Sequence, residues 1–313
     1  MVTRKEFTFP AKGDGHLLYG CVWVADGFEK YKAIVQIAHG MEEHILRYEG
    51  FASFLAKQGF LVCGNDHTGH GRSIEHFQDR GFFGEEEGSW QYLVEDMRYV
   101  MTFVQKHFPD LPHFLIGHSM GSFLAREFVT RWGEELTGAI FMGTSGGNPF
   151  LDIGILLSKE GVKRKGAKER GYAVNRLAFG AFNIKFLPKR TDYDWLSSVP
   201  EAVEAFIKDD KCGFVFTYAG YRELFLLLKE VSSSQWAECV PKKLPMLLIS
   251  GKEDPVGDYG KGVERVYHWL KDAGCEKVQI KLYDGGRHEI LHETFYRQVY
   301  RFLLRWFYEV LDM

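Results

Sequence analysis

The sequence predicts an α/β protein with a mostly parallel sheet, helices on both faces and a helical insertion. Short apolar segments alternate with helical stretches in two parts of the chain, and this pattern is typical of parallel sheets. The alternation stops at about residue 147 and resumes near 239. A length of 313 residues suits one large domain, or one domain with an insertion.

The expected elements follow the hydrophobic pattern in chain order. Residues 16–25 and 33–38 are predicted to be strands that form a hairpin or meander. Further strands are expected at 60–64, 113–116, 138–142, 246–250 and 278–283. Helices are expected at 48–58, 89–107, from about 120 to 132, 260–273 and 292–311.

Residues 147–238 differ in character from the rest of the chain. Apolar pieces in this interval are separated by glycines and by a basic stretch, residues 163–168, which is expected to be a loop. We expect a helical insertion over the carboxyl edge of the sheet, where α/β proteins bind their ligands. The chain is therefore divided into a core of residues 1–146 and 239–313 and a cap of residues 147–238.

Composition limits the class of protein and its partners. The net charge is −3 and 45% of the residues are hydrophobic, without an extended block of one charge sign, so no nucleic-acid partner is expected. The first residues lack an apolar signal region and no run is long enough to span a membrane. Five scattered cysteines without C-x-x-C spacing are expected to be idle thiols. A cytoplasmic location is expected.

Ser119 is the candidate nucleophile. It is the centre of Gly-His-Ser-Met-Gly, residues 117–121, with an apolar strand before it and a helical stretch after it. A serine at a tight turn from strand to helix presents its Oγ clear of the backbone. Ser145 lies in a second G-x-S-x-G pattern, but Asn148-Pro149 follows and breaks the chain, so Ser145 is assigned to a loop.

A serine nucleophile needs a carboxylate that orients its base, and the loop after strand 246–250 supplies candidates. Asp254 is favoured because Pro255 fixes an extended turn that directs a short side chain back into the site. Glu253 is the alternative. Asp258 is expected instead to cap the helix that begins near residue 259.

His288 is the candidate base. It follows the last predicted strand in the loop Gly285-Gly286-Arg287-His288, and it completes the chain order of serine, acid and histidine. It is the one histidine of twelve at such a position. His292 is assigned to the final helix or to the rim of the pocket.

Two backbone amides are expected to form an oxyanion hole. The N–H of Met120 follows the nucleophile and lies at the positive end of a helix. The N–H of Met41 is the second donor, because Gly40 lets the loop after strand 33–38 turn toward the site.

Two histidine-bearing or basic stretches admit other interpretations. Asp66–Ser73 contains two histidines and could be interpreted as a metal site, but its ligand spacing is wrong and a Gly-rich loop is the preferred interpretation. No metal or cofactor is expected. The basic residues of 163–170 are expected to be solvated, with transient contact to anionic head groups of a membrane surface as the alternative.

Five motifs together resemble the monoacylglycerol lipase and lysophospholipase branch of the α/β-hydrolases, which is grouped with serine-aminopeptidase-like hydrolases. The resemblance covers both core segments and fades in the insertion. The motifs are His39–His44 with Arg47-Tyr48, Asp66–Ser73, Gly117–Gly121, Asp254–Gly257 and Arg287–Leu291.

The resemblance implies a serine carboxylic-ester hydrolase with Ser119, Asp254 and His288 as its triad. Its substrate would be a small acyl ester, a monoacylglycerol or a lysophospholipid, and a fatty acid would leave through an acyl-enzyme. Short or aryl esters and amides remain alternative substrates, and a non-catalytic binding protein with this fold remains an alternative class.

The resemblance also implies a pocket for the alcohol side of the ester. Glu43 and Arg47 would lie near the glycerol hydroxyls, and His292 would contribute to substrate binding. The chain departs from the family pattern at two places. Met41 is bulkier than the small residue common there, and His292 falls one residue later than in animal relatives.

Overall fold

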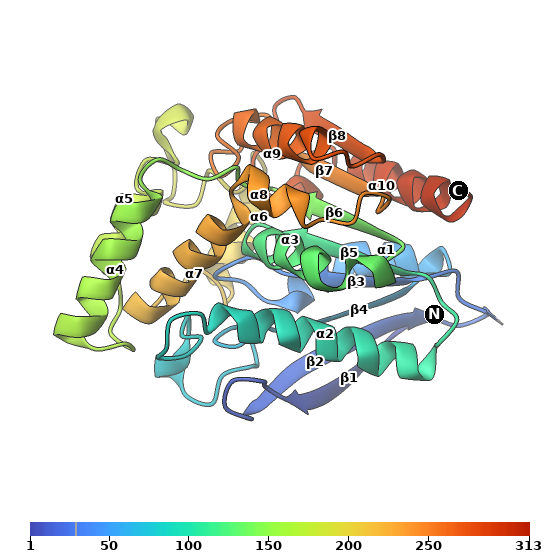
Figure 1. The fold of residues 1–313 in the computed structure, drawn as a ribbon, viewed down its shortest axis with the longest axis horizontal. Helices are drawn as coiled ribbons and strands as arrows, with labels where there is room; N and C mark the ends of the chain where they lie inside the picture. Colours follow the sequence, from blue (N-terminus) through green and yellow to red (C-terminus); the bar gives the residue numbers. More distant parts are fainter. Residues whose placement is uncertain (29) are drawn as a thin grey trace.

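A single eight-stranded sheet runs through the computed structural model, which describes residues 1–28 and 30–313 (Figure 1). The strand order is β1-β2-β4-β3-β5-β6-β7-β8. β1 pairs antiparallel with β2 and β2 pairs antiparallel with β4, while all other neighbours are parallel. The bounds are β1 Val2–Pro10, β2 Leu17–Ala25, β3 Ile34–Ala38, β4 Leu61–Asn65, β5 His113–His118, β6 Gly138–Met142, β7 Met246–Gly251 and β8 Val278–Tyr283.

The predicted α/β class is confirmed, but the start of the chain differs from the prediction. β1 was not expected, because most of its residues are polar and exposed at the edge of the sheet. The predicted hairpin or meander of strands 16–25 and 33–38 is wrong, because these two strands do not pair. β3 is buried along its whole length and lies between β4 and β5, so β2 pairs with β1 and β4 instead.

Helices cover both faces of the sheet. α2 (Trp90–His107), α3 (Met120–Trp132) and α9 (Lys261–Asp272) contribute to one hydrophobic core. α1 (Glu49–Lys57) and α10 (Tyr296–Leu311) contribute to the core on the opposite face. The central strands are buried on both faces and therefore form continuous apolar runs. These five helices confirm the predicted positions, although α10 begins four residues later than expected.

The interval between β6 and β7 is helical. In its described residues the one strand-like contact is an isolated bridge between Arg170 and Thr217. α4 packs on α7, and α7 packs on α3 of the core. α4 and α5 extend away from the sheet at the left of Figure 1. The bounds are α4 Leu151–Lys165, α5 Tyr172–Phe179, α6 Pro200–Lys208, α7 Tyr218–Val231 and α8 Ser234–Glu238.

The basic stretch of this interval is not a loop throughout, as was predicted. Lys163, Arg164 and Lys165 form the last turn of α4, and Gly166 ends the helix. Cationic side chains are favourable at a helix C-terminus, because they lie near its unsatisfied carbonyl groups.

No helix in the described part of the chain is both long and apolar enough to cross a membrane. α2, the longest of the described helices at 18 residues, carries charged side chains along its length. All five cysteines are free.

Candidate active site

Ser119 occupies the turn between β5 and α3, as the sequence predicts. Its φ of 52° lies in the left-handed region, which is strained for a residue with a side chain. The turn is held by the Ser119 amide, which donates a hydrogen bond to the Met142 carbonyl of β6 at 2.9 Å. The residue is 8% exposed and lines a cavity. A strained turn that presents a serine to a cavity is the geometry of a nucleophile.

The two glycines beside this turn are required by close backbone approach. A Cβ on Gly117 would lie 2.2 Å from the Gly121 carbonyl oxygen. A Cβ on Gly121 would lie 2.1 Å from the carbonyl oxygen of Ala38, at the end of β3. The G-x-S-x-G spacing is therefore a packing requirement, since it brings the first turn of α3 against the neighbouring strand.

Asp254 and His288 come together from the loops after β7 and β8. His288 Nδ1 lies 3.0 Å from Asp254 Oδ2, and both side chains are buried. Asp254 also accepts hydrogen bonds from Ser250 Oγ at 2.9 Å and from the Val256 amide at 2.9 Å. Burial alone would raise the pKa of the Asp254 carboxyl, but His288 and these donors hold the pKa below its ordinary value. An ionised Asp254 keeps the proton of a neutral His288 on Nδ1, which leaves Nε2 as an acceptor.

Ser119 and His288 line the same cavity, although no hydrogen bond joins their side chains in the described structure. The His288 ring lies between two aromatic neighbours, with ring centroids 4.7 Å from His118 and 5.1 Å from Trp195. A catalytic hydrogen bond between a serine and its histidine base is often longer in an unliganded enzyme than in its substrate complex.

The rival residues lie elsewhere. Glu253 is exposed, and its amide donates to the Gly286 carbonyl. Ser145 is buried outside the cavity lining, where its carbonyl accepts from Arg126 at 2.6 Å. The predicted cap by Asp258 is wrong, because α9 begins at Lys261 after Gly260, and the Asp258 side chain accepts no capping hydrogen bond. Asp258 instead adopts a φ of 49° in the preceding turn.

The Gly40–Met41 loop lies directly beside Ser119. A Cβ on Gly40 would be 3.1 Å from Ser119 Cβ, and the Gly40 amide donates to Glu43 Oε1 at 2.6 Å. The Met41 amide has no hydrogen-bond acceptor among the described residues. The Met120 amide belongs to the first turn of α3, whose N–H groups have no acceptor within the helix. Both amides are therefore available to an oxygen atom near Ser119.

His39 fixes the peptide group between Gly40 and Met41. His39 Nε2 accepts a hydrogen bond from the His67 amide at 3.0 Å, so the ring proton is on Nδ1. Nδ1 then donates to the Gly40 carbonyl oxygen at 2.7 Å. Burial, together with the nearby His67 and His70 rings, holds the pKa of His39 well below its ordinary value, so the ring is neutral. The carbonyl and the N–H of one trans peptide point in opposite directions, and fixing the first orients the second.

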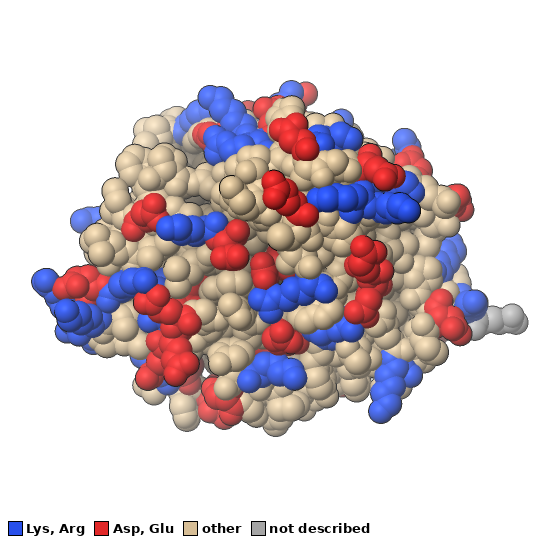
Figure 2. Space-filling view, in the orientation of Figure 1, with Lys and Arg blue, Asp and Glu red and all other residues tan. Residues whose placement is uncertain are grey.

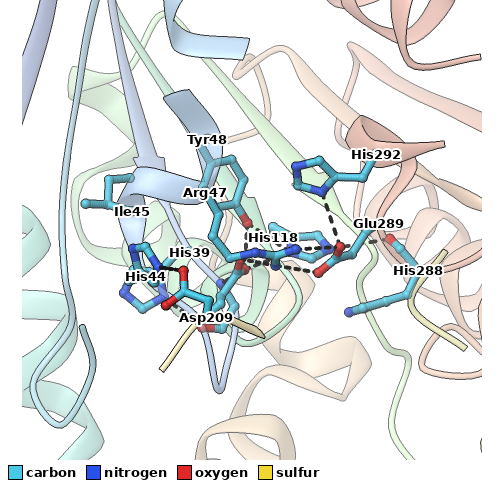
Figure 3. Close-up of polar contacts among 12 residues, drawn as sticks. His39, His44, Ile45, Arg47, Tyr48, His118, Asp209, His288, Glu289 and His292 are labelled. Carbon is cyan, nitrogen blue, oxygen red and sulfur yellow. Dashed lines mark hydrogen bonds and ion pairs between the residues drawn. The ribbon is translucent and has the colours of Figure 1, made fainter. Parts of the chain in front are cut away.

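The loop after β3, residues 39–44, is named here the oxyanion loop. A buried polar network lies beside it (Figure 3). Glu43 Oε1 accepts from Tyr48 Oη at 2.8 Å and lies 3.2 Å from His118 Nδ1. Arg47 donates to Glu43 Oε2 at 2.8 Å and forms two hydrogen bonds with the Glu289 carboxylate, at 2.5 and 2.8 Å. The network therefore connects the loop after β3, the residue before Ser119 and the residue after His288.

Charges in this network stabilise one another. Burial by itself raises the pKa of Glu43 and of Glu289, but His118 and Arg47 hold the Glu43 pKa well below its ordinary value, and Arg47 does the same for Glu289. Burial by itself lowers the pKa of His118, but the hydrogen bond with Glu43 raises it. His118 is not among the site residues predicted from the sequence, although its place beside Ser119 in the G-x-S-x-G motif was a usable signal.

The cavity at Ser119 has a volume of about 520 Å³ and is formed by both parts of the chain. The core contributes residues 40–43 of the oxyanion loop, His118 with Ser119, and His288 with Glu289 from the loop after β8. The sequence did not single out any of the residues that the insertion contributes, because no motif marks them. The lining from the insertion is Asn175, Arg176, Phe179, Gly180, Asn183, Lys189, Asp192, Tyr193, Trp195, Leu196, Phe206 and Val215.

Glu42 also lines the cavity and was not predicted. Its backbone has a φ of 57°, and its carbonyl accepts from the Gly213 amide at 3.0 Å. Burial raises the pKa of its carboxyl to about 8. Burial therefore favours the uncharged form of this carboxyl, and an ionised form would lose further solvation beside an apolar ligand.

Two of the residues expected to bind the alcohol do not reach the main cavity. Glu43 lines it, but Arg47 and His292 do not. His292 Nδ1 lies 3.2 Å from Glu289 Oε2, beside a separate cavity of about 10 Å³. That volume is at the lower limit for one water molecule.

Asp66–Ser73 is an internally bonded loop after β4. The Asp66 carboxylate accepts from the Ile45 amide at 2.8 Å and from the Arg72 amide at 2.7 Å. Across the described residues, the one group of potential metal ligands whose atoms lie within 4.8 Å of one another is His44, Asp209 and Cys212. None of these three lines the cavity at Ser119.

Known proteins resemble this chain along almost its whole length. The family model of serine aminopeptidase S33 matches residues 29–295. The chain is 26% identical over 296 residues to the monoglyceride lipase of Rattus norvegicus, covering 93% of this chain and 86% of the relative. It is 28% identical over 303 residues to the monoacylglycerol lipase of Mycolicibacterium smegmatis, covering 93% and 92%.

A solved structure agrees in fold and in class. The carboxyl esterase of Bacillus coagulans, determined in complex with glycerol, superposes with a TM-score of 0.92 at 29% identity, covering 99% of each chain. Because the family model covers most of the chain, the chain belongs to the serine aminopeptidase S33 family, and it is a serine ester hydrolase with the α/β-hydrolase fold.

Proposed function

We propose that this hydrolase releases a fatty acid from a monoacylglycerol, with Ser119 as nucleophile, His288 as base and Asp254 as the carboxylate that orients the base. One observation carries the proposal. Ser119 and His288 line a single cavity of about 520 Å³ whose remaining walls come largely from the helical insertion. Residues 147–238 would therefore act as a cap that selects the substrate.

The reaction has two halves. His288 Nε2 takes the proton of Ser119 Oγ while Oγ attacks the ester carbonyl carbon. The tetrahedral intermediate collapses as His288 gives this proton to the departing alcohol oxygen, which leaves the acyl group on Ser119. Water then attacks the acyl-enzyme in the same way and releases the fatty acid. Asp254, 3.0 Å from Nδ1, stabilises the imidazolium that forms in each half.

The amides of Met41 and Met120 would hold the oxyanion. Neither amide donates a hydrogen bond to another described residue, and the second lies at the positive end of α3. Loss of one such donor typically costs about 3–4 kcal/mol of transition-state stabilisation. Because both donors belong to the backbone, their direction depends on the loop around Gly40 and on the turn at Ser119.

The charges of the cavity favour an uncharged alcohol over a phosphate-bearing one. Besides the uncharged Glu42, its lining includes the carboxylates of Glu43, Asp192 and Glu289, against two cations, Arg176 and Lys189. Like charges at close range are unfavourable in a desolvated site. A glycerol ester meets this constraint better than a lysophospholipid, which remains the alternative substrate.

The acyl chain would lie along apolar side chains of the insertion. Phe179, Leu196, Phe206 and Val215 line the cavity together with Met41 of the core. Each buried methylene contributes up to about 0.8 kcal/mol to binding, so longer acyl chains should be preferred until the cavity is filled.

Glu43 and Arg47 are better described as positioning residues than as ligands for the alcohol. Glu43 already accepts hydrogen bonds from the Gly40 amide and from Arg47, and Arg47 is paired with Glu289. We propose that these contacts hold the oxyanion loop in place. His292, bonded to Glu289, would act through the same network.

The test compares Ser119→Ala with Ser145→Ala, its matched control from the second G-x-S-x-G motif. Each purified variant and the parent would be assayed with a long-chain monoacylglycerol, a lysophospholipid, a short aryl ester and an aryl amide. We expect the parent and Ser145→Ala to prefer the monoacylglycerol, and Ser119→Ala to be inactive. Labelling by a fluorophosphonate should require Ser119.

The outcomes separate the alternatives. Activity retained by Ser119→Ala would overturn the assignment of the nucleophile. A preference for the lysophospholipid, the short ester or the amide would replace the proposed substrate. Failure of the folded parent to react with every ester and with the fluorophosphonate would indicate a non-catalytic protein.

A further inference from the structure

A histidine, an aspartate and a cysteine come together where the oxyanion loop meets the insertion. His44 is the last residue of the oxyanion loop, while Asp209 and Cys212 follow α6 of the insertion. One side-chain atom from each of the three lies within 4.8 Å of the other two. His44 and Asp209 are 165 positions apart in the chain. The group is therefore a product of the tertiary fold and not of neighbouring residues in the sequence.

The two ligands from the insertion belong to one tight turn. The Cys212 amide donates to the Asp209 carbonyl oxygen at 3.0 Å, and the Lys211 amide donates to Asp209 Oδ1 at 2.9 Å. Oδ2 is then directed at His44, whose Nε2 lies 2.8 Å away (Figure 3). Outer hydrogen bonds of this kind orient carboxylates that bind metals. The turn thus presents a carboxylate oxygen and a thiol to the same imidazole.

The histidine is held from the core side. The amide of Ile45, the next residue, donates to Asp66 Oδ1 at 2.8 Å. A Cβ on Gly71 would lie 2.8 Å from His44 Cβ, so the loop after β4 packs closely against the histidine. The His44 side chain is 8% exposed and that of Asp209 is 31% exposed. The group is therefore rigid and buried on the histidine side and open to solvent on the carboxylate side, where an ion can enter.

The three kinds of donor atom favour zinc over the other common divalent ions. Zn²⁺ binds imidazole nitrogen, carboxylate oxygen and thiolate sulfur, and it accepts three protein ligands with water in the fourth position. Mg²⁺ and Ca²⁺ prefer oxygen ligands alone. One carboxylate and one thiolate would balance the two positive charges of the ion. The nearby cation of Lys211 is already paired with Asp210 at 2.6 Å.

Neither the general surface nor a histidine–carboxylate pair alone offers such a site. The net charge of the chain is only −3, and Figure 2 shows acidic and basic side chains intermixed on the face drawn. Among the described residues, other histidine–carboxylate pairs, such as His16 with Asp14, have no third ligand at such a range. Cys212, a free and partly buried thiol, supplies the ligand that those pairs lack.

We propose that His44, Asp209 and Cys212 bind one Zn²⁺ ion that ties the oxyanion loop to the insertion. A tetrahedral zinc ion holds such ligands about 3.3–3.7 Å apart, so the contact of 2.8 Å between His44 and Asp209 would lengthen by about half an ångström. Three coordinate bonds form, the thiol proton passes to the solvent, and the imidazole carries its proton on Nδ1. The Gly213 amide already joins the same two segments, by donating to the Glu42 carbonyl oxygen at 3.0 Å.

The ion would act as a structural clip and take no part in ester hydrolysis. None of its three ligands is among the described residues that line the cavity at Ser119. A ligand that binds the folded chain and not the unfolded chain stabilises the fold. At a hundredfold excess of free zinc over its Kd, we expect the Tm to rise by about 4 °C.

The experiment titrates the metal-free full-length protein, kept reduced, with Zn²⁺ by calorimetry and with Co²⁺ by absorbance. We expect one ion per chain. Co²⁺ should show the near-ultraviolet band of a thiolate ligand and the visible bands of tetrahedral coordination. These readouts need no substrate, so they decide the zinc site whether or not the proposed function holds.

Two pairs of variants test the ligands from the insertion. Cys212→Ser should weaken zinc binding by at least about a hundredfold and Asp209→Asn by at least about tenfold, since even an outer partner of a ligand contributes tenfold to a hundredfold. Cys212→Ser should also lose the thiolate band and the rise in Tm. Cys239→Ser, at an exposed free thiol, and Asp210→Asn, at the neighbouring exposed carboxylate, are the matched controls and should bind as the parent does. Without metal, Cys212→Ser should hydrolyse a soluble ester at the parent rate.

His44→Gln tests the third ligand, and His268→Gln, at an exposed histidine, is its control. His44→Gln should weaken zinc binding by at least about a hundredfold, while His268→Gln should not. Thermal unfolding without metal would show that every variant folds. The proposal is overturned if the parent binds neither ion, if Co²⁺ shows no thiolate band, or if Cys212→Ser or His44→Gln binds zinc as the parent does. A Tm that zinc leaves unchanged in the parent would overturn the role as a clip.

Discussion

The Nδ1 atom of His39 lies 2.7 Å from the carbonyl oxygen of Gly40, and this single contact sets the direction of the next amide. That amide belongs to Met41, the proposed oxyanion donor on the loop beside Ser119. His39 is neutral, completely buried, and held in one tautomer by the amide of His67. The proposed oxyanion hole would thus be aligned before a substrate arrives, which is the condition under which such donors are most effective.

His39→Ala should lower kcat by about tenfold to a hundredfold and leave KM nearly unchanged, because a misdirected Met41 amide weakens transition-state binding. His70→Ala is the matched control, since its ring is also buried and neutral but makes no contact with Gly40. Steady-state kinetics on a soluble ester would measure both, and thermal unfolding would show that both variants fold. Equal losses of kcat in the two variants would contradict a specific role for His39.

Asp254→Asn should lower kcat by about 10⁴-fold, because an amide at this position favours the wrong tautomer of His288. Glu253→Gln should have no effect, since the Glu253 side chain is exposed. This pair separates two neighbouring carboxylates between which the sequence could not fully decide. If instead Glu253→Gln caused the larger loss, the orienting carboxylate would have to be reassigned.

Glu42 should make the stability of the protein depend on pH. Burial raises the pKa of its carboxyl from an ordinary 4.5 to about 8. Between these values the unfolded chain releases the proton that the folded chain retains, so the free energy of unfolding falls as pH rises through this window. Glu42→Gln should therefore match the parent at pH near 4.5 and exceed its stability above pH 8 by about 1–2 kcal/mol, after allowance for solvent in the cavity.

Thermal unfolding of both proteins at the two ends of this window is the measurement. Glu253→Gln serves as the control at an exposed position and should follow the parent at both pH values. A gain in stability for Glu42→Gln that is the same at both ends would show that the effect comes from shape and not from the charge.

Much of the fold could be predicted from the sequence because the buried parallel strands and their helices have strong periodic patterns. β1 could not, since its residues are mostly exposed and polar at the edge of the sheet. The pairing of β2 could not either. Strands that are consecutive in the chain commonly pair. β3, however, is buried along its length in the centre of the sheet, and β4 and β5 pair with both of its edges, so β2 cannot pair with it.

In the candidate site, too, some residues could be predicted from the sequence and others could not. Ser119, Asp254 and His288 follow strand ends and carry local signals, so the sequence could nominate them. The residues between β6 and β7 that line the cavity, such as Phe179 and Trp195, meet the site only through tertiary packing and follow no motif. Arg47 shows the intermediate case: its motif identified it, but only the structure shows that Glu43 and Glu289 already occupy its guanidinium.

Arg47→Met should destabilise the protein by about 3–5 kcal/mol, because it leaves the buried carboxylates of Glu43 and Glu289 without their counterion. Adding Glu289→Gln should recover part of this loss, since it removes one of the uncompensated charges. Arg4→Met is the control, because Arg4 pairs with Glu49 at the surface, where an ion pair contributes about 1 kcal/mol or less. Urea unfolding would measure all four proteins. A loss for Arg47→Met no greater than that for Arg4→Met would mean that the buried network is not stabilising.

Gly121→Ala should remove most of the activity, although the residue contacts no substrate. The added Cβ would lie 2.1 Å from the Ala38 carbonyl oxygen and 2.5 Å from that of His39, both backbone atoms at the start of the oxyanion loop. Either this loop or the turn at Ser119 must move, and a displacement of about 1 Å at a reacting group can cost about a hundredfold in rate. Gly50→Ala is the matched control. Its Cβ would meet only the Tyr300 hydroxyl, at 3.4 Å, and alanine is the better helix former in α1. Gly50→Ala should therefore keep both activity and stability. If Gly121→Ala kept the parent kcat, the close approach of α3 to the oxyanion loop would not be what aligns the site.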